Sequence, residues 1–199
     1  MQKTVYIIPG WTEVASQKRY KKSISLFKRL GFNVIEVKIE WKNKVMSDYV
    51  NQFLAMKPKR GSYIFGFSLG AMIAFISANR VKPKTMILCS LSPYFKEDLA
   101  RSRQIYGKIF DKYFKKRDTD DLKRHSFSKI ANRVKCKVII FAGDKEDLYK
   151  GKYTPNVILR AKEAKKMVRN SRLIIVRNGK HDISQPQYHN AIKKVIYKL

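Results

Sequence analysis

Cysteine, acidic residues and long hydrophobic runs are all scarce in this sequence. Only 2 of its 199 residues are cysteine. We expect Cys89 at the C-terminal end of one strand and Cys136 at the start of the next, on opposite edges of a parallel sheet and beyond disulfide reach. No spacing of cysteine and histidine resembles a zinc site. Two free thiols favour a reduced, cytoplasmic protein over a disulfide-stabilised secreted one.

No apolar stretch approaches the roughly 20 residues that span a bilayer. The apolar part of the N-terminus, within residues 4–9, is too short for a secretory signal, and it is expected to form the first strand. Internal repeats and low-complexity linkers are also absent. With 44% hydrophobic residues, the chain is expected to form one globular domain over residues 1–199, large enough for a full core.

The shortage of acidic residues leaves a large positive charge. Lysine and arginine total 44 and aspartate and glutamate 15, so the net charge is +29. Such a surface attracts polyanions. The basic residues are nevertheless spread along the whole chain, without an arginine-rich arm, a zinc finger or an aromatic RNA-binding signature. We expect non-specific polyanion binding at low salt and no specific nucleic-acid partner, since a proteome-wide lysine bias explains spread charge equally well.

Apolar, β-branched runs alternate with helical patterns, which predicts parallel strands joined by right-handed helical crossovers. The expected architecture is α/β: a three-layer α/β/α sandwich with a mostly parallel six-stranded sheet. The strands are expected at residues 4–8, 33–39, 62–67, 85–90, 137–141 and 172–176. The helices are expected at about residues 16–30, 47–56, 69–79, 156–170 and 186–199.

One long segment does not fit this alternation. From about residue 96 to residue 134 the chain is polar, highly charged and helical in pattern, and it contains no strand signal. We interpret it as an insertion of two helices between consecutive strands. Because functional loops gather at the C-terminal ends of parallel strands, the insertion is expected to cover that edge of the sheet as a short cap.

The most informative motif is Gly66-Phe67-Ser68-Leu69-Gly70. It follows an apolar strand and precedes a small-residue helix, which is the context that a G-x-S-x-G nucleophile turn requires. A serine there lies on a strained turn with its hydroxyl beyond the end of the sheet. The flanking glycines let neighbouring backbone pass closely. The start of the following helix directs free N–H groups and a positive dipole end toward the same point. The alternative interpretation is an ordinary tight turn between a strand and a helix, without a nucleophilic serine.

Three further loops at the same sheet edge carry suggestive residues. The first strand ends in Pro9-Gly10-Trp11, the fifth in Gly143-Asp144-Lys145-Glu146-Asp147, and the sixth in Gly179-Lys180-His181. Serine, acid and histidine in this order match one type of catalytic triad. Over nearly its whole length the sequence resembles the α/β-hydrolase superfamily. It looks like a minimal member with a short cap, which lacks the two antiparallel strands that usually open that fold.

The resemblance implies a role for each of these residues. Ser68 would be the nucleophile and His181 the base that takes its proton. A carboxylate would fix the tautomer of His181. Ungapped spacing from Gly143 favours Glu146 as this acid, whereas the residue type usual in the family favours Asp147, and both remain open.

The oxyanion donors implied by the resemblance are the backbone N–H groups of Leu69 and Trp11. The loop after the first strand departs from the family pattern, because many relatives have His-Gly where this chain has Pro9-Gly10. The glycine is retained, which keeps the turn feasible.

The sequence therefore predicts a serine hydrolase that cleaves an ester or thioester of a small-molecule acyl substrate through an acyl-enzyme. The resemblance implies no metal or organic cofactor. Aromatic residues of the insertion favour an apolar acyl group, and the abundant lysines favour an anionic part elsewhere in the substrate. Two alternatives remain: a non-catalytic relative that binds a small ligand, and a basic protein that binds polyanions or nucleic acid. The sequence carries no signal of oligomeric state.

Overall fold

The computed structural model describes residues 2–149, 152–153 and 156–199 and contains a central sheet of six parallel strands. Their order is β2-β1-β3-β4-β5-β8, so the chain winds outward from β1 in both directions. The strands are β1 (Thr4–Ile8), β2 (Asn33–Glu36), β3 (Tyr63–Phe67), β4 (Thr85–Cys89), β5 (Lys137–Gly143) and β8 (Ser171–Val176). The all-parallel pairing confirms the expected α/β architecture.

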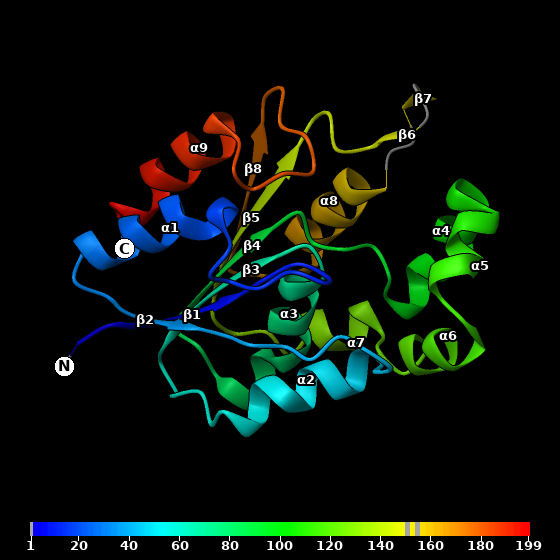
Figure 1. Ribbon diagram of the computed structural model, residues 1–199, viewed down its shortest axis with the longest axis horizontal. Helices are drawn as coiled ribbons and strands as arrows, with labels where there is room; N and C mark the ends of the chain where they lie inside the picture. The colour runs from blue at the N-terminus through cyan, green and yellow to red at the C-terminus, as the bar shows by residue number, and fades with distance from the viewer. Residues whose placement is uncertain (1, 150–151, 154–155) are drawn as a thin grey trace.

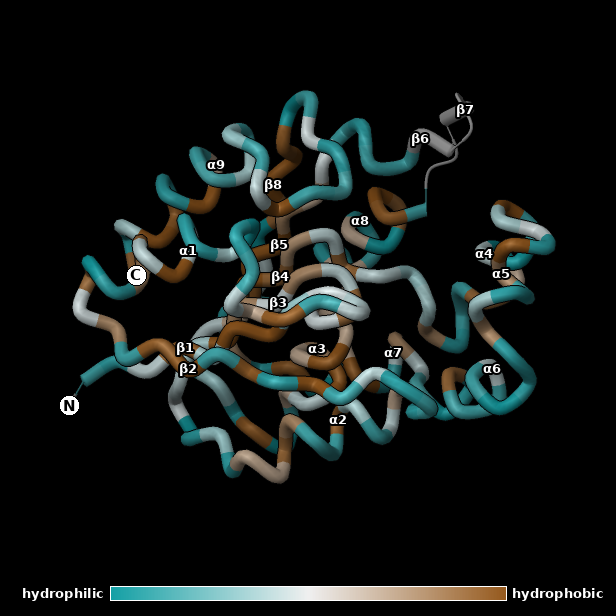
Figure 2. Tube along the Cα trace, viewed as in Figure 1, coloured by the Kyte–Doolittle hydropathy of each residue, from teal (hydrophilic) through white to brown (hydrophobic). Residues whose placement is uncertain are grey.

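Helices cover both faces of this sheet and create two hydrophobic cores (Figure 1). One face packs against α1 (Lys18–Arg29) and α9 (Pro186–Ile196). The other packs against α2 (Met46–Ala55), α3 (Leu69–Val81), α7 (Phe127–Ala131) and α8 (Val157–Met167). Figure 2 shows hydrophobic residues along the central strands and α3, with hydrophilic residues on the outer helices. Strands buried on both faces are expected to be continuously apolar, which is why the sequence located them well.

The segment predicted to form two helices is more fragmented than expected. It contains a 3₁₀ turn, η1 (Lys96–Asp98), and then α4 (Leu99–Tyr106), α5 (Lys108–Tyr113) and α6 (Lys116–Leu122) before α7. Gly107 interrupts the first of the two expected helices and separates α4 from α5, because its φ of 50° is incompatible with a continuous helix. Figure 1 shows α4, α5 and α6 grouped beside the sheet, apart from the helices that cover its faces.

Three smaller differences concern element ends. β2 stops at Glu36 instead of residue 39, because Glu36 already pairs with Ile7 and β1 ends one residue later. α8 spans Val157–Met167 and is shorter at both ends than expected. A two-stranded antiparallel pair, β6 (Leu148–Tyr149) and β7 (Lys152–Tyr153), has no counterpart in the sequence prediction.

Cys89 and Cys136 are both free, at opposite ends of the neighbouring strands β4 and β5, as the sequence indicated. Among the helices that the structure describes, none combines the length and the apolar character needed to cross a bilayer.

Candidate active site

Ser68 lies in a strained turn between β3 and α3. Its φ of 55° and ψ of −122° are rare for a residue with a side chain. The turn is fixed by close backbone packing, because a Cβ at Gly66 would lie 2.6 Å from the carbonyl oxygen of Gly70. A Cβ at Gly70 would in turn collide with the carbonyls of Ile8 and Pro9 at the end of β1. Both glycines of the motif are therefore sterically required.

The structure brings His181 against Ser68. The Nε2 of His181 lies 3.0 Å from the Oγ of Ser68, and its Nδ1 lies 3.0 Å from the Oε2 of Glu146. The imidazole also packs on the ring of Phe67, with a centroid distance of 5.0 Å. The His181 and Glu146 loops meet closely because Gly143 and Gly179 touch, where a Cβ on Gly143 would strike the carbonyl of Gly179.

The two candidate acids have different surroundings. The side chain of Glu146 is fully buried, and its Oε1 accepts hydrogen bonds from the Gly143 N–H at 2.6 Å and the Ser90 hydroxyl at 2.9 Å. Asp147 is also buried, but its carboxylate accepts from the N–H groups of Val157 and Ile158 at 2.8 and 3.0 Å. Asp147 thus caps the start of α8. The geometry places Glu146, and not Asp147, beside the histidine.

The residues of the two expected oxyanion donors, Leu69 and Trp11, line the same cavity as Ser68. Leu69 is the first residue of α3, where a backbone N–H has no partner within the helix. Gly10, Trp11, Ser68 and Leu69 line one cavity of about 280 Å³ together with His181. An acyl oxygen near Ser68 would thus lie between the end of β1 and the start of α3.

The loop that carries Trp11 is held by residues that the sequence analysis did not identify. The Gly10 N–H donates to the hydroxyl of Tyr20 at 2.8 Å and to the carboxylate of Glu13 at 3.2 Å. Tyr20 donates to Glu13, which also pairs with Arg19. Burial is the main cause that raises the pKa of Tyr20, so it remains a neutral hydroxyl. Tyr20 stands in the lysine-rich run of residues 18–22, yet its side chain is fully buried.

The hydroxyl groups of Ser90 and Tyr188 continue the hydrogen-bond contacts beyond Glu146. The Ser90 hydroxyl lies 3.0 Å from that of Tyr188 and donates to Glu146, and Ser90 itself has a φ of 55°. Tyr188 is fully buried on α9. No local pattern marks these residues, because the contact joins positions 98 apart in sequence. Cys89 lies nearby, and burial followed by the charge of Glu146 raises the pKa of its thiol.

A cavity of about 330 Å³ opens beside Ser68 and His181. Six of its described lining residues are aromatic, and four of these six belong to the inserted segment. The aromatic residues that line it are Trp11, Tyr94, Tyr106, Phe110, Tyr113 and Phe114. Trp11 packs edge-on against Tyr113 at 5.4 Å, which joins the loop after β1 to the insertion. No lysine or arginine is among the described residues that line this cavity.

No three or more His, Cys, Asp and Glu side chains are grouped to hold a metal ion within the part of the chain that the structure describes. Asp182, next to the histidine, points away from Ser68 and pairs with Arg19 at 3.0 Å. His125 and His189 lie on the insertion and on α9, and neither lines the cavities around Ser68.

No protein-family model and no curated protein matches the sequence. Solved structures do match the fold. Est1E from Butyrivibrio proteoclasticus superposes with a TM-score of 0.81 at 16% identity, covering 99% of this chain and 88% of that one. Its complex with ferulic acid gives a TM-score of 0.79 at 14% identity, covering 98% and 87%.

Two further matches come from different organisms. Alpha/beta hydrolase domain-containing protein 10 from mouse gives a TM-score of 0.75 at 14% identity, covering 100% of this chain and 90% of that one. The esterase EaEST from Exiguobacterium antarcticum gives 0.68 at 12% identity, covering 98% and 91%. Together with the six-stranded parallel sheet and the serine turn after β3, these similarities over nearly the full length show that this chain has the α/β-hydrolase fold.

Proposed function

We propose that this protein is a serine hydrolase that cleaves esters or thioesters of small, apolar acyl groups. One observation carries the proposal: Ser68, His181 and Glu146 form a continuous chain of contacts, each 3.0 Å long, at the mouth of an aromatic cavity. This row of three contacting side chains has the order of a nucleophile, a base and an orienting acid. The esterases among the similar structures agree with this class of reaction.

In the proposed reaction the Oγ of Ser68 attacks the acyl carbon while the Nε2 of His181 accepts its proton. The negative charge of Glu146 stabilises the imidazolium that forms. The carbonyl oxygen, now an oxyanion, accepts hydrogen bonds from the backbone N–H groups of Leu69 and Trp11. Collapse of the tetrahedral intermediate breaks the bond to the alcohol or thiol, which leaves with the proton from His181. A water molecule then attacks the acyl-enzyme with His181 again as base, releasing the acid and restoring Ser68.

The cavity favours an uncharged acyl group over the anionic substrate that the lysine content suggested. Its described lining offers aromatic rings and contains no cation to pair with a carboxylate or phosphate. A cavity of about 330 Å³ suits a short chain or one aromatic ring. The Est1E complex holds ferulic acid, itself an aromatic acid, which makes aryl esters sensible first substrates.

A fluorophosphonate probe tests the proposal. We expect one adduct, located on Ser68 by mass spectrometry, and p-nitrophenyl acetate, butyrate and benzoate turnover that is lost in Ser68→Ala and His181→Ala. Ser16→Ala and His189→Ala are the matched controls, because both residues lie outside the cavity that Ser68 lines. Folded wild-type protein that neither forms the adduct nor turns over any of these esters would reject the hydrolase proposal and favour a ligand-binding role.

A further inference from the structure

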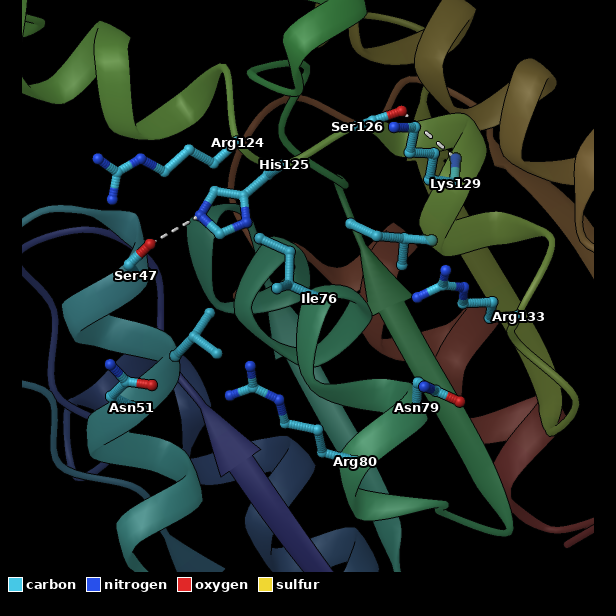
Figure 3. A pocket seen from close by; sticks show the side chains of 12 residues that line it. Ser47, Asn51, Ile76, Asn79, Arg80, Arg124, His125, Ser126, Lys129 and Arg133 are labelled. Atoms are coloured by element: carbon cyan, nitrogen blue, oxygen red, sulfur yellow. Dashed lines mark hydrogen bonds between the residues drawn. The ribbon is translucent and has the colours of Figure 1, made fainter.

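A second hollow runs along α3, separate from the aromatic cavity. It consists of two adjoining cavities, of about 400 and 450 Å³, which share the lining residues Asn79 and Arg133. We call this surface the basic groove. The first cavity contains Arg80, Arg124, Lys129 and Arg133, and the second adds Arg60, Lys82 and Lys135. Figure 3 shows Arg80, Arg124 and Arg133 approaching the first cavity from three different segments.

The cations of the basic groove are not held in ion pairs by the acidic residues that the structure describes. None of these lysines and arginines forms an ion pair within residues 2–149, 152–153 and 156–199, and no acidic residue lines either cavity. Elsewhere arginines are paired: Arg19 with Glu13, and Arg160 with Asp98. Like charges held around a hollow without counter-charges repel one another, so an anion bound there would gain from all of them.

His125 lines the first cavity of the groove. Burial is the main cause that lowers its pKa, and the charges of Arg124 and Arg80 lower it by less than Asp121 raises it. Asp121 opposes this effect from 3.6 Å, but its carboxylate is largely occupied by the N–H and hydroxyl of Ser47. Ser47 also contacts His125 at 3.1 Å, as Figure 3 shows. Asp121 therefore offsets part of the positive charge at the His125 end, but among the described residues it forms no ion pair with the lysines and arginines of the groove.

The basic groove is distinct from the proposed catalytic centre. It shares no lining residue with either cavity next to Ser68. Arg80 follows Ser68 by twelve positions on α3, which corresponds to about 18 Å along a helix. A ligand in the groove would thus bind without contacting the acyl substrate.

We propose that the basic groove binds a small ligand that carries two or more phosphate groups. Arginine guanidinium groups match phosphate oxygens in a two-pronged geometry, and the groove has three arginines around its first cavity alone. Asn51 and Asn79 supply neutral donors in the same cavity. No phenylalanine, tyrosine or tryptophan lines the groove, so it lacks the stacking surfaces that single-stranded nucleic acid uses.

Titration calorimetry with tripolyphosphate in 150 mM NaCl tests this inference, with orthophosphate as the singly phosphorylated comparison. We expect one tripolyphosphate per chain, and at least tenfold weaker binding of orthophosphate. Arg80→Gln combined with Arg133→Gln should weaken tripolyphosphate binding at least tenfold. Lys21→Gln combined with Lys22→Gln removes the same charge from α1, on the other face of the sheet, and should change the affinity less than twofold.

Equal weakening in the two double variants, or several equivalent tripolyphosphate molecules per chain, would overturn the proposal and leave only general attraction to a charge of +29. Tighter binding of a ten-residue oligo-dT than of tripolyphosphate, with the same dependence on Arg80 and Arg133, would also overturn it in favour of nucleic acid. Ser68→Ala should bind tripolyphosphate like the wild type, so the result does not depend on the proposed hydrolase activity.

Discussion

Replacing Glu146 by glutamine tests whether the buried carboxylate assists His181. The substitution keeps the size of the side chain and removes its charge. The carboxylate contacts the Nδ1 of His181 at 3.0 Å and is fully buried, whereas the histidine side chain is 44% exposed. Glutamine can also donate its amide N–H toward Nδ1, which favours the tautomer that cannot accept the proton of Ser68. Both effects should lower kcat and leave substrate binding almost unchanged.

The charge effect can be estimated from this geometry. Two unit charges with centres about 4 Å apart interact by about 4 kcal/mol at an effective dielectric constant near 20. Solvent around the exposed edge of His181 reduces this to roughly 2–3 kcal/mol. Each 1.36 kcal/mol corresponds to tenfold in rate, so loss of the charge alone should lower kcat by about 30- to 150-fold. The unfavourable tautomer adds to this decrease.

The assay is steady-state hydrolysis of p-nitrophenyl butyrate by Glu146→Gln and Asp147→Asn. Asp147→Asn is the matched control, because the adjacent carboxylate binds the start of α8. It should lower the free energy of unfolding by about 1 kcal/mol and change kcat less than twofold. If Asp147→Asn abolishes turnover and Glu146→Gln retains it in folded protein, the assignment of the acid is wrong.

Three further changes probe the surroundings of the site. Gly70→Ala should destabilise the fold by more than about 2 kcal/mol in urea unfolding, because its Cβ would collide with the carbonyl of Pro9. Tyr188→Phe removes a hydroxyl 3.0 Å from that of Ser90, and should lower kcat several-fold at constant KM. His125 has a pKa lowered mainly by burial, so the folded protein binds fewer protons than the unfolded chain just below pH 6.5. Stability should be full above pH 6.5 and fall as the pH drops through the folded pKa, with a smaller decrease in His125→Asn.

The sequence predicted the sheet well because each central strand is buried on both faces. Runs such as Tyr63–Phe67 and Thr85–Cys89 are continuously apolar, and little else in a chain of this charge has that pattern. The cap was predicted less well. Its helices are short, and their ends depend on local backbone geometry, as at Gly107, where a positive φ separates α4 from α5. Helical periodicity cannot resolve breaks between pieces of six to eight residues.

The candidate site also contains residues that the sequence predicted and one that it left open. Ser68 and His181 were predictable because each stands in a loop directly after a strand, so the topology brings them together. The carboxylate beside His181 was ambiguous because Glu146 and Asp147 are adjacent in sequence and both have buried side chains. Glu146 follows Gly143 by three positions and its side chain folds back onto the Gly143 N–H, which directs the other oxygen to His181. The position beside His181 thus agrees with the spacing, and the role of Glu146 there stays a prediction.

The distribution of charge connects the two proposed binding surfaces. In a chain of net charge +29, lysine and arginine are absent from the described lining of the aromatic cavity and crowd the basic groove. Arg80 lies about 18 Å from Ser68 along α3, beyond the screening length of about 8 Å at physiological salt, so its charge contributes little field there. The described lining of the aromatic cavity thus lacks lysine and arginine, while the same helix presents Arg80 to the basic groove toward its other end. The two surfaces are linked by α3 and by the insertion, which carries Arg124 in the groove and Tyr106, Phe110, Tyr113 and Phe114 in the aromatic cavity.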